Sequence, residues 1–394
     1  MDDIFKKIDE VCLENSKKVL NAFWKENLGE SDFNSTTGYG YGDIGRDKIE
    51  RIYSDIFKSE ASLVRNQFIS GTHAISTCLF ALLRPGDTLL SITGKPYDTL
   101  DSIIGFNDNK SSLKSFGIDY RQVDLIDSNF DYDKIKKLLE SEKIKVIEIQ
   151  RSIGYSNRNT ISIESLEKVI KFIRSIDKDV IIMVDNCYCE FVGVREPIEV
   201  GADICVGSLI KNLGAGISEN GAYITGRKDL IYLCSERLNM PGEAWDVGPS
   251  LNANKMFLKG LYFAPSVVAS ALKTNVYAAY KLEKMGINVS PKYNEDKSDI
   301  VLKVIFNDKD KLIKFVSLIQ KNSAIDASVY PIPSKMPGYD DEIIMASGSF
   351  TQGSSIELSC DGPIRSPYIA YLQGSLTYEY GKIAIDNIIN ELSK

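Results

Sequence analysis

One lysine near the middle of the chain stands in surroundings that can change its chemistry. Lys211 follows a predicted strand over residues 204–206 and lies within residues 207–216, which are mostly small or apolar. Partial desolvation disfavours the charged form of a lysine, and the neutral amine is the form that attacks an aldehyde to make an imine. The alternative interpretation is an ordinary lysine of a loop or a helix start.

A carboxylate ends a strongly apolar predicted strand earlier in the chain. Residues 180–185 read VIIMVD, so Asp185 is the last residue of the strand, and Asn186 follows it. The carboxyl ends of strands form the ligand crevice in open α/β sheets, so Asp185 is placed to face the nitrogen of a cofactor ring. The alternative is an aspartate that caps the next segment.

A third candidate is a helix start that suits an anion. Ser70, Gly71, Thr72 and His73 lead into an apolar helix that runs to about Leu83. Ser70 and Thr72 can cap this helix, and exposed N–H groups with the helix dipole favour a phosphate there. A capped helix start without a phosphate is the alternative.

These residues need a scaffold, and the pattern of residues 60–230 predicts one. Short apolar runs alternate with helical patterns, which is typical of strand–helix–strand units around a mostly parallel sheet. The predicted strands are β-branched and continuous, at 88–93, 145–149, 180–185, 204–206 and 222–225. A helix over 163–175, with one apolar face, is expected to cover the sheet.

The pattern changes in the last third of the chain. A long helix over 265–285 ends at Gly286, a residue suited to a left-handed helix end, and we place a domain boundary near this helix. A smaller α+β domain is predicted after it, with elements at 300–306, 309–320, 343–358, 368–373 and a last helix from Thr377.

Composition excludes several other classes of protein. The net charge is −7 without a dense basic cluster, which argues against nucleic-acid binding. Seven scattered cysteines and a single histidine, His73, make a disulfide framework, a zinc site or a Ser–His–Asp hydrolase improbable. Neither a membrane span nor a secretory leader stands out, so we expect a cytoplasmic protein that does not bind membranes.

Taken together, the three candidates resemble the fold-type I pyridoxal-phosphate enzymes, most closely the cystathionine and methionine lyase group. The family's Ser-x-x-Lys turn matches Ser208 and Lys211, and its Val-Asp-Asn strand end matches at Asp185. The resemblance implies a Schiff-base lysine at Lys211, a ring-nitrogen partner at Asp185, phosphate ligands at Ser208, Ser70, Gly71 and Thr72, and a ring-stacking, catalytic tyrosine at Tyr97.

Within this group, the chain resembles the methionine gamma-lyase-related or aluminium-resistance carbon–sulfur lyases. The similar stretches lie at 38–50, 70–76, 91–100, 207–212 and 361–379, so the resemblance spans nearly the whole chain. It implies an α/β fold of the pyridoxal-phosphate-dependent transferase type I, with a large three-layer domain on a mostly parallel sheet and a smaller C-terminal α+β domain. We expect an N-terminal helical segment with a subunit-crossing loop over 1–58, the large domain over 59–264 and the small domain over 265–394.

The sequence departs from the better-known lyases at several contacts. The early Tyr-Ser-Arg motif is replaced by Gly-Tyr-Gly-Tyr, which leaves Tyr39 and Tyr41 as cofactor contacts across subunits and Arg46 as a substitute for the arginine. The Asn-Pro pair after the middle strand has no counterpart, and Arg151 is a candidate for that region. Arg365 lies about where the family binds the substrate carboxylate.

The expected function is a pyridoxal-phosphate-dependent carbon–sulfur lyase that acts on an amino acid of the cystathionine or methionine type by beta or gamma elimination. Lys211 is expected to anchor the cofactor and remove the substrate's alpha proton. A homo-oligomer, a dimer or a tetramer, with shared active sites is expected. The alternatives are aldol cleavage, racemisation or transamination with the same cofactor, or a non-catalytic stress or metal-tolerance protein of this fold.

Overall fold

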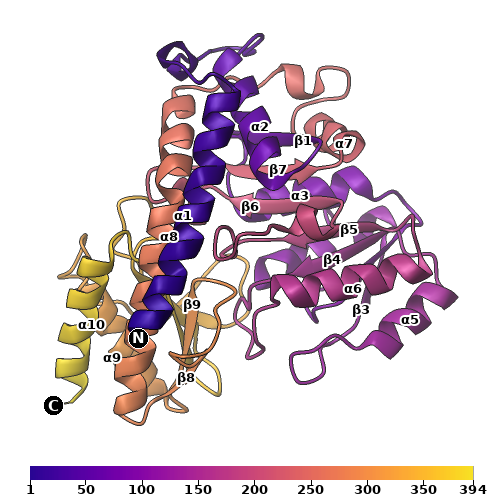
Figure 1. Cartoon of the computed structure of the whole chain (residues 1–394). Helices are drawn as coiled ribbons and strands as arrows, with labels where there is room; N and C mark the ends of the chain where they lie inside the picture. Colours follow the sequence, from indigo (N-terminus) through magenta and orange to yellow (C-terminus); the bar gives the residue numbers. More distant parts are fainter. Residues whose placement is uncertain (394) are drawn as a thin grey trace.

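A seven-stranded sheet forms the centre of the larger unit in the computed structural model, which describes residues 1–393 (Figure 1). Its strands are Ala61–Arg65 (β1), Thr88–Ser91 (β2), Asp119–Gln122 (β3), Val146–Gln150 (β4), Ile181–Asp185 (β5), Ile204–Ser208 (β6) and Ala222–Gly226 (β7). The spatial order is β1-β7-β6-β5-β4-β2-β3. In this order, the neighbours β6-β5, β5-β4, β4-β2 and β2-β3 pair in parallel, whereas β7 is antiparallel to both β6 and β1.

Helices cover both faces of this sheet, because its buried strands alternate their side chains between two cores. In β5, Ile182 and Val184 belong to the core under helices α5 (Tyr132–Ser141) and α6 (Ile163–Ile176). Met183 belongs to the opposite core, under α3 (Gly71–Leu82) and α7 (Lys228–Leu238). A short helix, α4 (Asp101–Ile104), follows β2.

The second unit is a six-stranded antiparallel sheet in the C-terminal third. Its strands are Asn288–Ser290 (β8), Val301–Ile305 (β9), Ser334–Lys335 (β10), Glu342–Ala346 (β11), Ser359–Pro363 (β12) and Ile369–Gln373 (β13), in the order β10-β11-β12-β13-β9-β8. One face, with Ala370 and Leu372, packs with helices α9 (Lys309–Lys321) and α10 (Tyr378–Leu392). The other face, with Tyr371, contacts Tyr155 of the larger unit.

Two long helices join the units. Helix α1 (Asp2–Lys25) lies alongside α8 (Ala253–Lys284), as Figure 1 shows, and α2 (Ile44–Phe57) packs against the first strand of the larger sheet. Pro265 lies inside α8, so the division that we expected between residues 264 and 265 falls within a continuous helix. Residues of α8 contribute to the core beside the larger sheet and to that of the smaller one.

The sequence pattern located most of the elements and missed the polar or short ones. The five predicted strands of the large sheet are confirmed as β2, β4, β5, β6 and β7. Strand β3 was missed because its sequence, DYRQ, is polar and half exposed at the sheet edge. The predicted strand over 343–358 was wrong beyond Ala346, where an irregular segment precedes β12.

No helix within residues 1–393 is long and apolar enough to cross a membrane. Within the same residues, no group of three histidine, cysteine or acidic side chains is placed to hold a metal ion.

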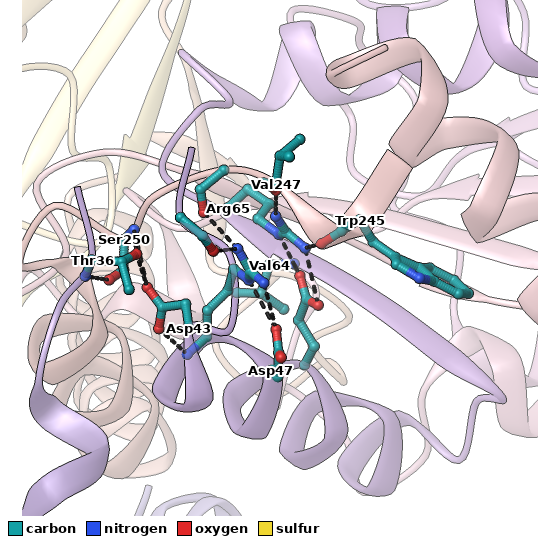
Figure 2. A network of polar contacts seen from close by, with 12 residues as sticks. Thr36, Asp43, Asp47, Val64, Arg65, Trp245, Val247 and Ser250 are labelled. Carbon is teal, nitrogen blue, oxygen red and sulfur yellow. Dashed lines mark hydrogen bonds and ion pairs between the residues drawn. The ribbon is translucent and has the colours of Figure 1, made fainter. Parts of the chain in front are cut away.

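The buried side chain of Arg65 ties the first strand of the larger sheet to α2 by an ion pair and to the segment before α8 by hydrogen bonds (Figure 2). Arg65 donates from Nε to Glu50 Oε1 over 2.6 Å, and its other nitrogens donate to the carbonyl oxygens of Val247 and Trp245 at 2.5 and 2.8 Å. Nearby, Asp43 caps α2 and accepts from the Thr36 hydroxyl. Because Arg65 is 1% exposed, its charge depends on these partners.

Arg65→Met tests this anchor. The substitution leaves the Glu50 carboxylate buried without its cation, so we expect the free energy of unfolding to fall by about 3–5 kcal/mol. Urea denaturation measures the change. The double variant Glu50→Gln/Arg65→Met carries no buried charge, so part of the loss is expected to return. An Arg65→Met protein as stable as the wild type would contradict the assignment.

Candidate active site

The ends of three elements meet at one point of the larger sheet. Gly71 begins α3 so close to β6 that an added Cβ would stand 3.1 Å from the Ser208 Cβ and 3.4 Å from the sulfur of Cys187, which follows β5. Ser70 caps α3, with its hydroxyl accepting from the His73 N–H over 3.1 Å. The helix N-terminus and two strand ends thus lie together at the place where the sequence predicted an anion site, and anion binding there stays a prediction.

The turn that carries Lys211 is fixed by its backbone. Leu209 N–H donates to the Gly221 carbonyl over 2.9 Å, and the Lys211 carbonyl accepts from Gly214 and Ala215, each at 3.2 Å. A Cβ on Gly214 would stand 1.6 Å from the Leu209 oxygen, so only glycine fits this approach. The turn is therefore rigid, and the lysine side chain starts from a defined position.

In this structure, nearby groups oppose the desolvation from which we expected a neutral amine at Lys211. Burial lowers the pKa of its ammonium group, but Cys187, Tyr188 and Asp185 raise that pKa by more, so it lies above its usual value. The Nζ atom stands 3.9 Å from the centroid of the Tyr188 ring, a cation–π contact. Desolvation alone was a poor guide because the acidic surroundings of the lysine outweigh it.

Asp185 and Lys211 lie within electrostatic reach of each other. Asp185 is 7% exposed, and one of its carboxylate oxygens accepts from the Cys187 N–H over 3.1 Å. Its strand pairs in register with β6, where Val206 is its neighbour, and with β4, where Gln150 is its neighbour. The aspartate therefore ends a central strand beside the lysine turn, as predicted.

Tyr97 joins the site through a group of tyrosines from both units. Its hydroxyl lies 2.5 Å from the Tyr339 hydroxyl, and its ring centroid lies 5.9 Å from that of Tyr155. Thr72 reaches the same region, since its hydroxyl lies 2.9 Å from that of Thr99. Tyr339 belongs to the smaller unit, so the site lies between the two units.

Tyr39 and Tyr41 stand apart from this group. They are 68% and 60% exposed, and their rings stack on each other with centroids 5.6 Å apart. Arg46 behind them is buried and donates to the carbonyl oxygens of Gly40 and Gly248, so it holds the loop in place. A contact of the two tyrosines with a second subunit stays a prediction.

The two predicted substrate arginines are engaged elsewhere in the chain. Arg151 is 4% exposed and donates to the side-chain oxygen of Asn186 over 2.7 Å. Arg365 pairs with Asp341 at 2.7 Å and donates to the Tyr155 carbonyl at 3.1 Å. Their guanidinium groups stabilise loops in this structure, and their roles toward a substrate stay predictions.

Several acidic groups near the site were not predicted. Burial raises the pKa of Glu148 and of Glu190 to about 8, and that of Asp361 to about 7. The charge of Asp185 contributes to the shift at Glu148, whereas Lys211 partly opposes the shifts at the other two. Asp361 opens the stretch 361–379 that we had noted, but sequence alone does not say which way a strand residue faces.

The strand order, the buried lysine and the anion cradle together define the class of protein. This is the architecture of the fold-type I pyridoxal-phosphate enzymes. The Escherichia coli protein YhfS, named as pyridoxal-5'-phosphate dependent, superposes with a TM-score of 0.65 at 20% identity, covering 98% of this chain and 97% of its own. At that identity, the likeness concerns the fold alone.

Closer relatives give the family. The chain matches the methionine gamma-lyase family over residues 1–393 and belongs to it, which makes it an enzyme of the carbon–sulfur lyase class. The uncharacterized Bacillus subtilis protein YnbB is 48% identical over 392 residues, covering 99% of this chain and 93% of YnbB. A Listeria monocytogenes structure, named as a candidate cystathionine beta-lyase involved in aluminum resistance, is 46% identical with a TM-score of 0.96 and covers 99% of this chain and 96% of that one.

The raised pKa of the buried Glu148 carboxyl group predicts that the stability of the protein depends on pH. Its ordinary pKa is 4.5, and burial raises it to about 8 in the folded chain, where Ser91 donates to one carboxyl oxygen. Between these values, the unfolded chain loses a proton that the folded chain keeps, so stability falls by about 1.4 kcal/mol per pH unit for this group. Urea denaturation of Glu148→Gln between about pH 5 and pH 8 is expected to give a flatter profile of unfolding free energy against pH than the wild type.

Glu140→Gln is the matched control, because Glu140 lies at the surface of α5 in an exposed ion pair with Lys136. This variant is expected to keep the wild-type slope of unfolding free energy against pH. Equal slopes for Glu148→Gln and the wild type would show that Glu148 is ionised in the folded chain.

Proposed function

We propose that this carbon–sulfur lyase binds pyridoxal phosphate at Lys211 and acts on a sulfur-containing amino acid of the cystathionine or methionine type. The observation that carries the proposal is the juxtaposition of a buried lysine, a buried aspartate at a strand end and a helix N-terminus that approaches Ser208 closely at Gly71. A phosphate, an aldehyde and a ring nitrogen are the three groups that such a set suits.

The residues present fit the phosphate of the cofactor. The start of α3 offers the backbone N–H groups of Gly71 and Thr72 together with the positive end of the helix dipole. Ser208 faces this start from the end of β6, and a side chain at Gly71 would fill the space between them. These residues, with Ser70, would hold the phosphate.

Lys211 and Asp185 would serve the reacting end of the cofactor. Lys211 Nζ would hold the aldehyde carbon covalently, and after release by the substrate amine it would take the proton from the substrate's alpha carbon. Asp185 would keep a proton on the ring nitrogen, since a buried carboxylate favours a positive charge beside it. Tyr97 would pack on the ring from the side of β2.

The cofactor, when bound, withdraws electrons from the alpha carbon, so that a sulfur substituent at the beta or gamma carbon can leave. The tyrosines around Tyr97 would exclude water from this space, because Tyr97, Tyr155 and Tyr339 enclose it from two units. We also propose a cytoplasmic homo-oligomer, a dimer or tetramer, in which the exposed Tyr39 and Tyr41 meet a neighbouring subunit's site.

Lys211→Ala tests the attachment. Borohydride reduction in the presence of pyridoxal phosphate is expected to fix a pyridoxyl group on Lys211 of the wild type, which peptide mass spectrometry locates. The variant lacks the amine and is expected to stay unlabelled, with release of keto acid from cystathionine or methionine lowered by at least about a hundredfold. The surface variant Lys314→Ala is the control and is expected to behave as the wild type. Labelling elsewhere, or activity that survives Lys211→Ala, refutes the proposal.

Asp185→Asn tests the role of Asp185 at the ring nitrogen separately from the attachment of the cofactor to Lys211. Asparagine cannot hold the nitrogen proton by charge, so we expect turnover to fall by about a hundredfold to ten-thousandfold. Borohydride labelling of Lys211 is expected to persist, because the amine remains. Asp133→Asn, at the exposed start of α5, is the control. Full activity of Asp185→Asn would remove this role from Asp185 and leave the attachment to Lys211 untouched.

A further inference from the structure

The carboxyl group of Asp361 faces the site from the smaller unit. Asp361 in β12 pairs directly with Tyr371 in β13, and directly paired residues of antiparallel strands project from the same face of a sheet. Tyr371 packs on Tyr155, whereas the neighbouring Cys360 belongs to the core on the other face. Asp361 therefore points toward the larger unit and its strand ends.

Tyrosines surround this carboxyl group and connect it to the lysine. The Tyr155 ring centroid lies 5.3 Å from that of Tyr371 and 5.7 Å from that of Tyr339. The charge of Asp361 acts on the pKa of Tyr97, Tyr155 and Tyr339, and Lys211 acts on the pKa of Asp361. The carboxyl group thus belongs to the space that holds the Lys211 amine.

The side chains that line this space combine partial exposure with polar ends that protein encloses. Lys211, Tyr97, Tyr339 and Asp361 are all half-buried, although protein surrounds each of their polar ends. Burial raises the pKa of Asp361 to about 7, and the Tyr155 hydroxyl, Lys211 and Gln373 oppose that shift only in part. The carboxylate is therefore costly to ionise until a further positive partner arrives.

A second acceptor lies beside Asp361. Gln373 is 3% exposed and donates its amide nitrogen to Asp361 Oδ1 over 3.2 Å. Its side-chain oxygen, Oε1, has no hydrogen-bond partner within residues 1–393. The guanidinium group of Arg365 is engaged by Asp341 and the Tyr155 carbonyl, and no hydrogen bond from it to Asp361 or Gln373 is seen within residues 1–393. A carboxylate and an amide oxygen both accept hydrogen bonds, so together they suit an ammonium group, which only donates them.

We propose that Asp361 and Gln373 form a subsite for a distal ammonium group, so that the enzyme prefers sulfur amino acids with a second, positively charged amino group at the far end of the side chain. This inference rests on the proposed function and names its substrate class. A neutral thioether such as methionine leaves the subsite without a donor, whereas a thioether with a second amino group, such as cystathionine, supplies one. Buried polar groups left unpaired penalise the ligand that lacks the partner.

Two pairs of compounds test the subsite on the cofactor-loaded protein. S-(2-aminoethyl)-L-cysteine and S-propyl-L-cysteine have side chains of equal length and differ in a terminal ammonium or methyl group; their kcat/KM values are compared. L-Lysine and L-2-aminoheptanoic acid differ in the same way and lack a sulfur leaving group, so calorimetry gives their Kd values without turnover. We expect the wild type to prefer the ammonium compound in each pair by about tenfold or more.

Asp361→Asn is expected to bring both ratios within about threefold of unity, because the neutral amide no longer attracts the cation. Asp310→Asn, at the exposed start of α9, is the matched control and is expected to keep the wild-type preference. Thermal melting reports whether Asp361→Asn is folded, and Asp361→Ser replaces it if it is not. The wild-type comparison needs no variant and tests the subsite on its own.

The outcomes separate this inference from the proposed function. A wild type that is labelled at Lys211 but treats the members of each pair alike overturns the subsite and leaves the proposed function standing. Preference for the ammonium compounds that persists in Asp361→Asn overturns the assignment to Asp361. A protein that takes up no pyridoxal phosphate at Lys211 overturns both.

Discussion

The buried ammonium group of Lys211 is the charge around which the site is arranged. It needs compensation because desolvation disfavours it, and Asp185, Glu190 and the face of the Tyr188 ring provide it. These groups come from the end of β5 and the loop that follows. The position of the lysine is in turn set by the glycine-dependent turn after β6, so the charge arrangement depends on a backbone feature that admits no side chain at Gly214.

The smaller unit completes this arrangement through one loop of the larger unit. The segment after β4 carries Tyr155 and is held from the smaller unit, where Asp299 accepts from Ser152 and Lys303 donates to the Arg158 carbonyl. Arg365 donates to the carbonyl of Tyr155 itself. The loop that forms a wall of the site is thus bound to the sheet that bears Asp361, which keeps the two walls in a fixed relation.

Much of the large unit could be predicted because its strands are continuous β-branched runs, and its chemistry could be placed because strand ends converge in such a sheet. Asp185, Ser208 and the start of α3 follow that rule. Asp361 and Tyr339 do not, since their place depends on how the antiparallel sheet packs against the loop after β4. The elevated pKa of Lys211 could not be predicted from the sequence either, because it depends on Cys187 and Tyr188, which lie beside the lysine only in the folded chain.

The acidity of the site has a consequence for what it can accept. Burial is the main cause that raises the pKa values of Cys187 and Tyr188, and it raises the pKa of Glu190 to about 8, so the surroundings of Lys211 disfavour further negative charge. A positive group that enters the site draws the neighbouring carboxyls toward ionisation, whereas a second negative group must be met by backbone N–H donors, as at the start of α3. The two proposed sites therefore differ in charge: we propose an anion at the helix N-terminus and a cation against the smaller sheet.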